Sequence, residues 1–516
     1  MSEKSRTEYS VINIMTGIVG YVINTILGFI CRIVFVKCLS ADYLGANGLF
    51  TNLLTMLSLA ELGIGSAIVY ALYKPLAEHD EKKIASLVRF YGKAYRIIGI
   101  VVAVVGLCMM PFLNVIIREQ PDIVESIYLL YLINLFNTAS TYFFSYKSSL
   151  IIAAQQNYLV TAVNYTVTIL QSIIQMIFLL KTHNYLIYLL IQTVGTFSYN
   201  VVISWLADKK FPYIKNNSEP LLPEERASLF ANIRDLTIYK ISGLLVNSTD
   251  NILITFFKGL ATTGVASNYT LLTTTLNSLL SQVFNGLTAS VGNHNALEDE
   301  ESRFQMFSFL NLMNFWIYGW ASLGIIFCSS SIVELCFGKE YILNITIPMV
   351  LALNFYTVGM QNAVWTYKQT LGLFRYGRFL QIVTAGLNIF FSVVFGYKFG
   401  LFGILFATFL ARMFTNLWYD PYAVFTYGFN RSPFIYLKKY INYLIVFAIA
   451  AALCTVAFVY QPESILLEVL YRVIVCSLIT NMIFYLAFRK TSEFDKFKHI
   501  LKRVYKLIMQ RLKQVM

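Results

Sequence analysis

The chain contains 516 residues, of which 57% are hydrophobic and only 13% are charged, with a formal net charge of +13. Soluble domains are roughly half apolar and about a quarter charged, so a soluble globule could not bury this much apolar surface. The mean hydropathy of +0.62 points the same way. We therefore exclude a soluble enzyme or a nucleic-acid-binding protein and expect an integral membrane protein.

Runs of apolar residues, separated by charged and turn-forming residues, predict about fourteen transmembrane segments. Each run is long enough for a helix to cross a hydrocarbon core of about 30 Å. Every segment should be helical, because alternation with a period of two is absent and a lipid-facing backbone must satisfy its own hydrogen bonds. The predicted segments are residues 11–37, 43–70, 97–117, 127–150, 158–180, 184–206, 236–257, 264–290, 306–331, 342–363, 379–397, 400–419, 441–460 and 465–488.

The basic residues indicate the orientation, since Lys and Arg stay on the cytoplasmic side during insertion. They are most dense in residues 74–96, 209–234 and 489–513. With an even number of spans, all three clusters are cytoplasmic when both termini are cytoplasmic. This is the expected topology of a multi-pass protein of the bacterial inner membrane. The loops predicted outside are short, which leaves no room for an external catalytic domain.

Matches of the chain with itself indicate an internal duplication. Residues 45–55, GANGLFTNLLT, are similar to residues 264–274, GVASNYTLLTT, at an offset of 219. The residues around Lys147 match those around Lys368 at an offset of 221, with Asn134 over Asn354 at 220. Such an offset spans six helices, so the halves should run in the same direction about an axis along the membrane normal.

We therefore predict an all-α membrane protein with two six-helix bundles, residues 1–207 and 236–419, joined by a cytoplasmic linker at 208–235. Two additional transmembrane helices follow in residues 420–488. Residues 489–516 place apolar side chains three or four apart among Lys and Arg, which predicts a basic amphipathic cytoplasmic helix. A partly disordered tail is the alternative. Two parallel bundles with a cleft between them are typical of alternating-access transporters.

Several segments of the chain resemble a known family. YLGANGLFTNLLTMLSLAELGIGSAI occupies residues 43–68, YKPLA follows at residues 73–77, and NSTDNILI occupies residues 247–254. These segments are similar to polysaccharide transporters of the Wzx type, members of the multidrug/oligosaccharidyl-lipid/polysaccharide (MOP) exporter superfamily. The resemblance is most specific over residues 40–77, and in helix count it covers essentially the whole chain.

The resemblance implies a flippase that carries undecaprenyl-diphosphate-linked oligosaccharide repeat units from the cytoplasmic to the outer leaflet, for surface polysaccharide synthesis. It implies two bundles arranged as a V, with a cavity lined by basic residues. The expected partners are this lipid-linked oligosaccharide, membrane lipid, a polysaccharide polymerase and glycosyltransferases. No cofactor is expected, and the motif does not identify the sugar.

Ionisable residues inside predicted helices are costly in a bilayer and are therefore candidate functional residues. Arg32 and Asp250 both lie in the outer part of their predicted helices, at similar depth. They are predicted either to pair or to act as a diphosphate contact and an ion-coupling acid, respectively. The structural alternative is a snorkelling Arg32 and an Asp250 bonded to Asn247 or Asn251. Glu61, near the inner end of its helix, is the second candidate for ion coupling.

Four further cations lie in or just beyond the inner half of their predicted helices, where they would meet a diphosphate entering from the cytoplasm. With Arg32 they form the predicted substrate-binding set, and interfacial anchoring is the alternative for each of them. Glu468 and Arg472 are four residues apart and should form a helical ion pair. The four cations are Lys147, Lys240, Lys368 and Arg412.

Two other functions compete with this interpretation. A membrane-embedded polysaccharide polymerase would need catalytic acids on a large outside loop or a carboxylate cluster for a metal. The chain shows neither pattern, and its four His and seven Cys lack metal-ligand spacing, so we expect neither an enzyme nor a metal site. A cation- or proton-coupled drug exporter of the same superfamily is the nearer alternative. Its cavity should be acidic, whereas the candidate charges here are five basic and two acidic.

Overall fold

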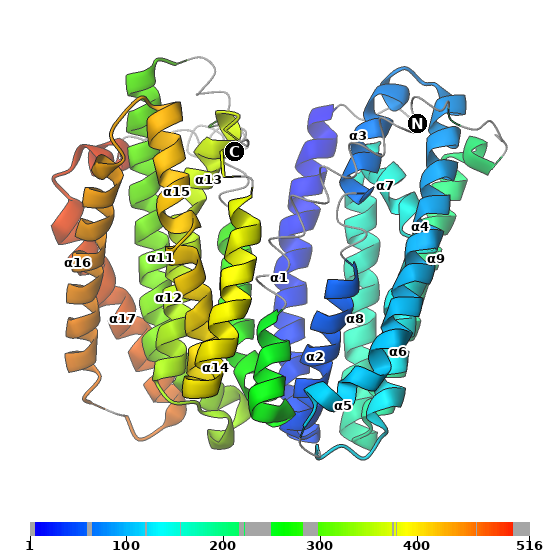
Figure 1. The fold of residues 1–516 in the computed structure, drawn as a ribbon, viewed down its shortest axis with the longest axis horizontal. Coiled ribbons are helices and arrows are strands. Elements are labelled where there is room, and N and C mark those ends of the chain that lie inside the picture. The colour runs from blue at the N-terminus through cyan, green and yellow to red at the C-terminus, as the bar shows by residue number, and fades with distance from the viewer. Residues whose placement is uncertain are drawn as a thin grey trace, which may run out of the picture. The chain divides into compact units, whose positions relative to one another are not determined.

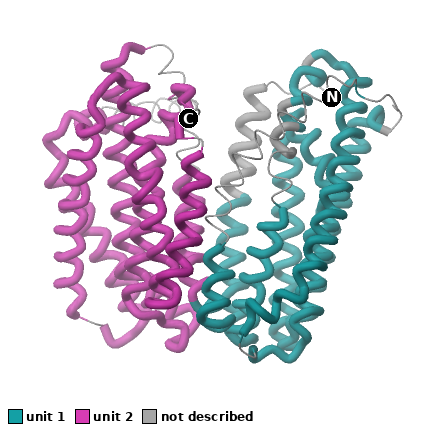
Figure 2. The backbone as a smooth tube through the Cα atoms, in the orientation of Figure 1, with its two compact units in different colours: residues 1–265 teal, residues 266–516 magenta. Residues whose placement is uncertain are grey.

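The computed structural model describes residues 6–58, 64–118, 121–154, 156–215, 221, 249–281, 291, 298–373, 376–377, 379–460 and 462–498. These residues are predominantly helical, and no strand occurs among them. The chain forms two compact units, Met1–Val265 and Ala266–Met516 (Figure 2). The all-helical architecture confirms the predicted fold class.

The first unit is a bundle of helices drawn from blue to green in Figure 1. Helical residues 249–265 also belong to this unit and continue to residue 281. Its helices are α1 (Arg6–Cys38), α2 (Ala41–Leu57), α3 (Ile64–Ala77), α4 (Glu81–Met109), α5 (Leu113–Ile116), α6 (Ile127–Thr141), α7 (Tyr146–Ala153), α8 (Asn157–Thr182) and α9 (Tyr185–Lys210), with short 3-10 helices at Met110–Phe112 and Pro212–Lys215.

The second unit is also a helix bundle (Figure 1). A short helix at residues 492–498 follows its last long helix. The described helices are α11 (Glu300–Phe337), α12 (Thr346–Met360), α13 (Asn362–Thr370), α14 (Leu380–Met413), α15 (Asn416–Ala423), α16 (Phe434–Ala457) and α17 (Ile465–Phe488), with a 3-10 helix at Lys339–Tyr341 and a π-helical turn at Val424–Gly428.

Corresponding helices of the two units begin and break at matching positions. Asp80 Oδ1 accepts a hydrogen bond from the Lys83 amide at 2.9 Å and caps α4, while Asp299 Oδ1 accepts from the Ser302 amide at 2.9 Å and caps α11. The two caps occupy equivalent positions of the sequence repeat. Each side chain satisfies an amide that has no partner within its own helix. A further match is that α7 follows closely after α6, as α13 follows closely after α12.

The predicted spans fit the described helices, although residues 59–63, 236–248 and 282–290 of these spans lie outside the described part of the chain. Two pairs of spans fall within continuous helical stretches. The helical stretch 249–281 is interrupted at Gly259, with φ 82°, and α14 is interrupted at Gly400, with φ 57°. Glycine adopts this region without the strain that a Cβ would add. By length and composition alone, eight described helices could span a membrane. Spans that break into two helices, such as α6 and α7, are too short in each piece to be counted.

The beginning of α2 lies against helical residues 260–264 at very short distance. A Cβ on Gly45 would lie 2.0 Å from the carbonyl oxygen of Leu260, and a Cβ on Gly264 would lie 2.1 Å from that of Ala41. Gly45 and Gly264 are equivalent positions of the sequence repeat, and so are Ala41 and Leu260. The contact therefore repeats itself with the two partners exchanged, and only glycine permits so close a backbone approach.

Burial in both units follows the pattern of a membrane bundle. Large apolar side chains such as Leu180, Phe390 and Leu478 are exposed, whereas Asn311 and Asn388 are fully buried. Lipid chains are as apolar as leucine, so helices associate through close packing and polar contacts rather than through hydrophobic burial. The exposed apolar faces are therefore consistent with contact to lipid.

Candidate functional site

The first unit contains a partly buried ion pair between α7 and α9. Lys147 Nζ lies 2.7 Å from Asp208 Oδ1 and donates a hydrogen bond to Ser204 Oγ at 2.8 Å. Ser204 and Asp208 are four residues apart on α9, so both side chains lie on the face next to Lys147. The Lys147 side chain is 15% exposed and that of Asp208 is 18% exposed.

The second unit contains a corresponding pair between α13 and α15. Lys368 Nζ lies 2.6 Å from Asp420 Oδ1, and Trp365 Nε1 donates a hydrogen bond to Asp420 Oδ2 at 3.0 Å. The Asp420 side chain is only 2% exposed. Both carboxylate oxygens of Asp420 are therefore held by donors from one neighbouring helix, as a buried charge requires.

Both lysines follow a break in a membrane helix. Residues 142–145 form the turn between α6 and α7, where Ser145 Oγ donates to the carbonyl of Thr141 at 2.7 Å. Near the break between α12 and α13, Asn314 Nδ2 of α11 donates to the carbonyl of Gly359 at 2.6 Å. Backbone groups freed inside a bilayer need such partners, because each unsatisfied group costs several kcal/mol. Polar side chains thus support the breaks that precede the lysine-bearing helices.

The two carboxylates change the charge balance expected from the sequence. Asp208 falls in the predicted linker 208–235, and Asp420 directly follows the predicted span 400–419, so sequence reasoning missed both. The helices α9 and α15 extend beyond those boundaries, to Lys210 and Ala423. Acids within a few residues of a predicted helix end are the signal that could have found them, because helix boundaries are the least certain part of such predictions. Lys147 and Lys368 are therefore each paired with a carboxylate.

Arg32 lies on α1 beside an aromatic cluster. The ring of Phe35 packs edge-on against those of Tyr185 and Tyr188, at 5.7 and 5.2 Å between centroids, and the two tyrosine rings stack at 5.9 Å. Tyr185 donates a hydrogen bond to Asn47 Oδ1 at 3.3 Å, and the charge of Arg32 acts on Tyr188. Arg32 thus lies near Tyr188 of α9 and one helical turn from Phe35 on α1.

The remaining predicted site residues lie in different places. Asp250 is partly buried on helical residues 249–281, and its neighbour Asn251 packs beside Gly48, within 3.5 Å of the position a Cβ would take. Arg412 is partly buried in the last turn of α14. Glu61 and Lys240 lie outside the described residues. The pairing of Arg32 with Asp250 stays a prediction.

The predicted helical pair in the last long helix is confirmed. Arg472 Nε lies 2.7 Å from Glu468 Oε1, and both side chains are 18% exposed. Arg472 also donates to the carbonyl of Phe327 at 3.0 Å, and Ser331 Oγ donates to Glu468 at 2.9 Å. The pair therefore fixes α17 to α11 and has no free charge to offer a substrate.

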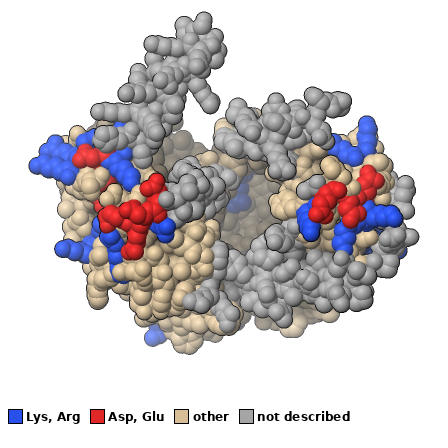
Figure 3. All heavy atoms as spheres, turned by 90° about the horizontal axis from the view of Figure 1, so that it is seen from above, with Lys and Arg blue, Asp and Glu red and all other residues tan. Residues whose placement is uncertain are grey.

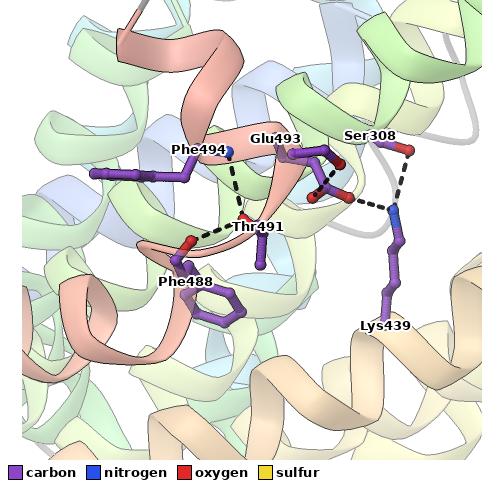
Figure 4. A network of polar contacts seen from close by, with 7 residues as sticks. Ser308, Lys439, Phe488, Thr491, Glu493 and Phe494 are labelled. Atoms are coloured by element: carbon purple, nitrogen blue, oxygen red, sulfur yellow. Dashed lines mark hydrogen bonds and ion pairs between the residues drawn. The ribbon is translucent and has the colours of Figure 1, made fainter.

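The chain that follows α17 is held by a polar network (Figure 4). Lys439 Nζ of α16 lies 2.7 Å from Glu493 Oε1 and donates to Ser308 Oγ of α11 at 3.1 Å. The ring of Phe494 stacks on Trp316 at 5.7 Å. Although the tail is predicted from its sequence to lie on the inner leaflet, its described beginning packs against the protein. Residues 499–516 lie outside the described part.

The ionisation of Glu493 is shifted by this network. Burial acts to raise the pKa of Glu493, but hydrogen bonds from Lys439 and from the backbone, together with the charge of Lys439, lower the pKa below its ordinary value. A carboxylate beside an ammonium group is favoured in its charged form. Glu493 is therefore an anion at neutral pH.

Charged side chains gather over each unit at the end shown in Figure 3, where acidic and basic groups lie close together. In the second unit, Arg431 forms an ion pair with Glu301 and its guanidinium lies 4.1 Å from the ring centre of Phe304. Within the described ranges, no group of three His, Cys, Asp or Glu side chains could hold a metal ion. The candidate substrate-binding charges remain those predicted from the sequence inside the helices.

No protein-family model and no curated protein sequence matches the chain. Solved structures do match it. The lipid II flippase MurJ, in an inward closed conformation, is 14% identical with a TM-score of 0.66, and the match covers 92% of this chain and 99% of that one.

Structures of multidrug resistance MATE family transporters of the MOP superfamily also match. An inward-facing structure is 14% identical, with a TM-score of 0.58 and coverage of 78% of this chain and 94% of that one. An outward-facing structure is 13% identical, with a TM-score of 0.51 and coverage of 82% and 96%. At such low identity the likeness concerns the fold alone. The chain therefore has the multi-pass helical fold seen in the lipid II flippase MurJ and in MATE family transporters of the MOP superfamily.

Proposed function

We propose that the chain is a flippase that moves undecaprenyl-diphosphate-linked oligosaccharide repeat units from the cytoplasmic to the outer leaflet by alternating access. The observation that carries this proposal is the extent of the fold match. The lipid II flippase structure matches 92% of the chain, whereas the two MATE structures match 78% and 82%. The lipid II flippase structure thus covers a larger share of the chain than either of these two MATE structures.

The charges inside the helices fit an anionic headgroup. Arg32, Arg412 and Lys240 are the cations that we assign to the diphosphate, and Lys147 and Lys368 join them when they leave their carboxylates. Arg binds phosphate through a planar fork of donors, and Lys binds it as a point charge. The aromatic and amide groups beside Arg32 would suit sugar rings and hydroxyls. Glu61 and Asp250 are the proposed ion-coupling acids.

The proposed setting is the bacterial inner membrane with both termini in the cytoplasm. The membrane potential, positive outside, favours outward passage of a diphosphate by about 2.3 kcal/mol per charge per 100 mV. A polysaccharide polymerase and glycosyltransferases would act on the same lipid-linked intermediates. No catalytic step is assigned to the chain.

A drug exporter is the second candidate, because MATE transporters share the fold. Asp208 and Asp420 also make the candidate charges more balanced than the sequence suggests. A cationic substrate would need acids that are free to receive it. In the described structure each of these carboxylates is paired with a lysine, and each of the two lysines with a carboxylate, so these pairs do not distinguish the two candidates.

A deletion strain distinguishes the two candidates. If the chain is a flippase, its loss should cause lipid-linked repeat units to accumulate on the cytoplasmic face, and a plasmid-borne copy should remove them. The measurement is mass spectrometry of extracted polyprenyl diphosphates. An unchanged lipid profile, together with hypersensitivity to cationic dyes, would overturn the flippase proposal in favour of a drug exporter.

A further inference from the structure

The two lysine–aspartate pairs occupy corresponding places in the two units. Lys147 and Lys368 are repeat mates in the sequence, and each lies on the helix that follows a break. Their Nζ atoms lie 2.7 and 2.6 Å from a carboxylate oxygen, and both lysine side chains are 15% exposed. The pairing is therefore a repeated feature of the fold and not an isolated contact.

The carboxylates reach the lysines from unequal sequence positions. Asp208 lies near the end of the long helix α9, whereas Asp420 lies in the short helix α15 that follows α14. Lys368 and Asp420 are 52 residues apart in the sequence, whereas Lys147 and Asp208 are 61 residues apart. The same combination of charges thus occurs in both units although the positions of the acids have diverged.

Stability alone gives little reason for such pairs. Moving two charges out of water is opposed by desolvation, and replacing a buried ion pair with apolar side chains is often neutral or stabilising. A lone lysine or a lone aspartate in the same place would be strongly unfavourable, because its charge would be uncompensated. The lysine of each pair therefore needs an opposite charge, but that charge need not come from the protein.

A diphosphate can supply the opposite charge to the lysine. It carries at least two negative charges and several acceptor oxygens, whereas a carboxylate carries one charge on two oxygens. Asp420 has a second donor in Trp365, at 3.0 Å, and so keeps one partner when Lys368 leaves. In the first unit Lys147 has a further acceptor in Ser204, at 2.8 Å. When the ion pair opens, Asp420 thus keeps a donor in the second unit, whereas in the first unit it is Lys147 that keeps a partner.

We propose that Asp208 and Asp420 are exchangeable partners of Lys147 and Lys368, respectively. An anionic headgroup that binds a lysine displaces the aspartate from it. This inference rests on the proposed function, because it assigns the lysines to a diphosphate. Displacement breaks the links between α7 and α9 and between α13 and α15, so binding of the anion loosens both helix pairs. Without an anion the pairs close again, and each lysine regains its opposite charge. The two aspartates are positioning residues, because the two helix pairs separate only when an anion has replaced the aspartate beside each lysine.

The proposal predicts that removing the negative charge of Asp208 or Asp420 strengthens the binding of an anion to the protein. The probe is farnesyl diphosphate, a short water-soluble prenyl diphosphate, titrated calorimetrically into the purified full-length protein in lipid nanodiscs. Asp420→Asn keeps the shape of the side chain and an acceptor for Trp365 but removes its charge. We expect Asp420→Asn and Asp208→Asn each to bind the probe about tenfold more tightly than the wild type.

Matched variants control for indirect effects. Asp495→Asn removes an exposed carboxylate that lies 3.1 Å from Lys498, and it should leave the affinity unchanged. Lys368→Met leaves the buried Asp420 without an opposite charge and can prevent folding for that reason alone. The double variant Lys368→Met with Asp420→Asn is therefore measured beside it. The double variant has neither charge of the pair, should remain monodisperse, and should bind the probe more weakly than Asp420→Asn.

The outcomes separate this inference from the proposed function. If the wild type binds the probe and both Asn variants bind it no more tightly, the exchange is overturned while a flippase remains. If the double variant binds as tightly as Asp420→Asn, Lys368 does not hold the anion and the exchange is again overturned. If no variant binds the probe and lipid-linked oligosaccharide does not accumulate in the deletion strain, the proposed function is overturned together with the exchange.

Discussion

Gly45 and Gly264, which are equivalent positions of the sequence repeat, each lie against the backbone of the segment that carries the other. A Cβ on either glycine would approach a carbonyl oxygen to 2.0 or 2.1 Å. Small residues at such crossings let membrane helices come together closely and gain packing energy that lipid cannot supply. The contact joins the beginning of α2 to the helical residues just before the boundary of the first unit at Val265.

Alanine at either glycine should therefore destabilise the protein. We expect Gly45→Ala and Gly264→Ala each to lower the free energy of unfolding by about 1–3 kcal/mol or more, because the backbones must separate to admit the methyl group. The measurement is the thermal unfolding midpoint in detergent. Gly28→Ala is the matched control, since no atom lies within 4 Å of its added Cβ. Equal midpoints for all three variants would show that the close contact does not contribute.

The Lys368–Asp420 pair should show strong coupling in a double-mutant cycle. Lys368→Met and Asp420→Asn alone each leave one buried partner without its opposite charge, which should cost about 3–5 kcal/mol. The double variant should recover most of that loss, because neither charge remains. Unfolding free energies in detergent give the coupling energy. Additive losses would mean that the ion pair at 2.6 Å does not hold its partners together.

The docking of residues 492–498 should depend on pH. Because the pKa of Glu493 is lowered in the folded state, its contribution to stability is complete above its ordinary pKa and is lost as the pH falls through the lowered value. Undocking separates Phe494 from Trp316, so the emission of Trp316 should shift at acidic pH. The difference between the spectra of the wild type and Trp316→Phe isolates that emission.

Lys439→Met provides the control for this titration. Lys439 lowers the pKa of Glu493, so its removal should move the transition to higher pH. A transition that stays at the same pH in Lys439→Met would assign the acid sensitivity to another group.

Arg32 and Arg412 should be required for transport. Loss of a hydrogen bond to a charged group costs about 1.5–3 kcal/mol, so Arg32→Ala and Arg412→Ala should each reduce flipping about tenfold or more. Surface polysaccharide in a complemented deletion strain is the readout, with membrane levels of the protein measured in parallel. Lys339→Ala, which removes a cation whose side chain is 86% exposed, is the control. If export stays intact in both arginine variants, the cationic site is placed wrongly.

Asp250 should link transport to an ion gradient. Asp250→Asn cannot release or bind a proton, so flipping in proteoliposomes should lose its response to an imposed proton or sodium gradient. Asp250→Glu keeps the ionisable group and should retain part of the response. An Asn variant with undiminished, gradient-sensitive flipping would refute this role for Asp250.

Much of the helical architecture was predictable because it depends on local composition. Apolar runs identify the spans, and the segment around Gly45 with its match at Gly264 indicates the duplication before any contact is seen. The pair of Glu468 and Arg472 was also predictable, since side chains four residues apart on one helix are neighbours. Such inferences need only the helical period and the solvent preference of each side chain.

The partners of Lys147 and Lys368 were not predictable in the same way. Each carboxylate lies far along the chain from its lysine and belongs to another helix. Its position depends on where a break occurs and how far the partner helix extends, and neither is specified by local periodicity. The docking of Phe494 on Trp316 has the same origin, because a tail with apolar side chains at helical spacing suits a leaflet as well as a protein groove.

The unequal positions of Asp208 and Asp420 bear on how relatives of this chain should be compared. An alignment of the two halves that superimposes Lys147 on Lys368 does not superimpose their acids. In such an alignment, the column that contains Asp208 has no aspartate from the second half, and the column that contains Asp420 has none from the first. Comparisons based on spatial neighbours would instead recover a lysine–aspartate pair in both halves.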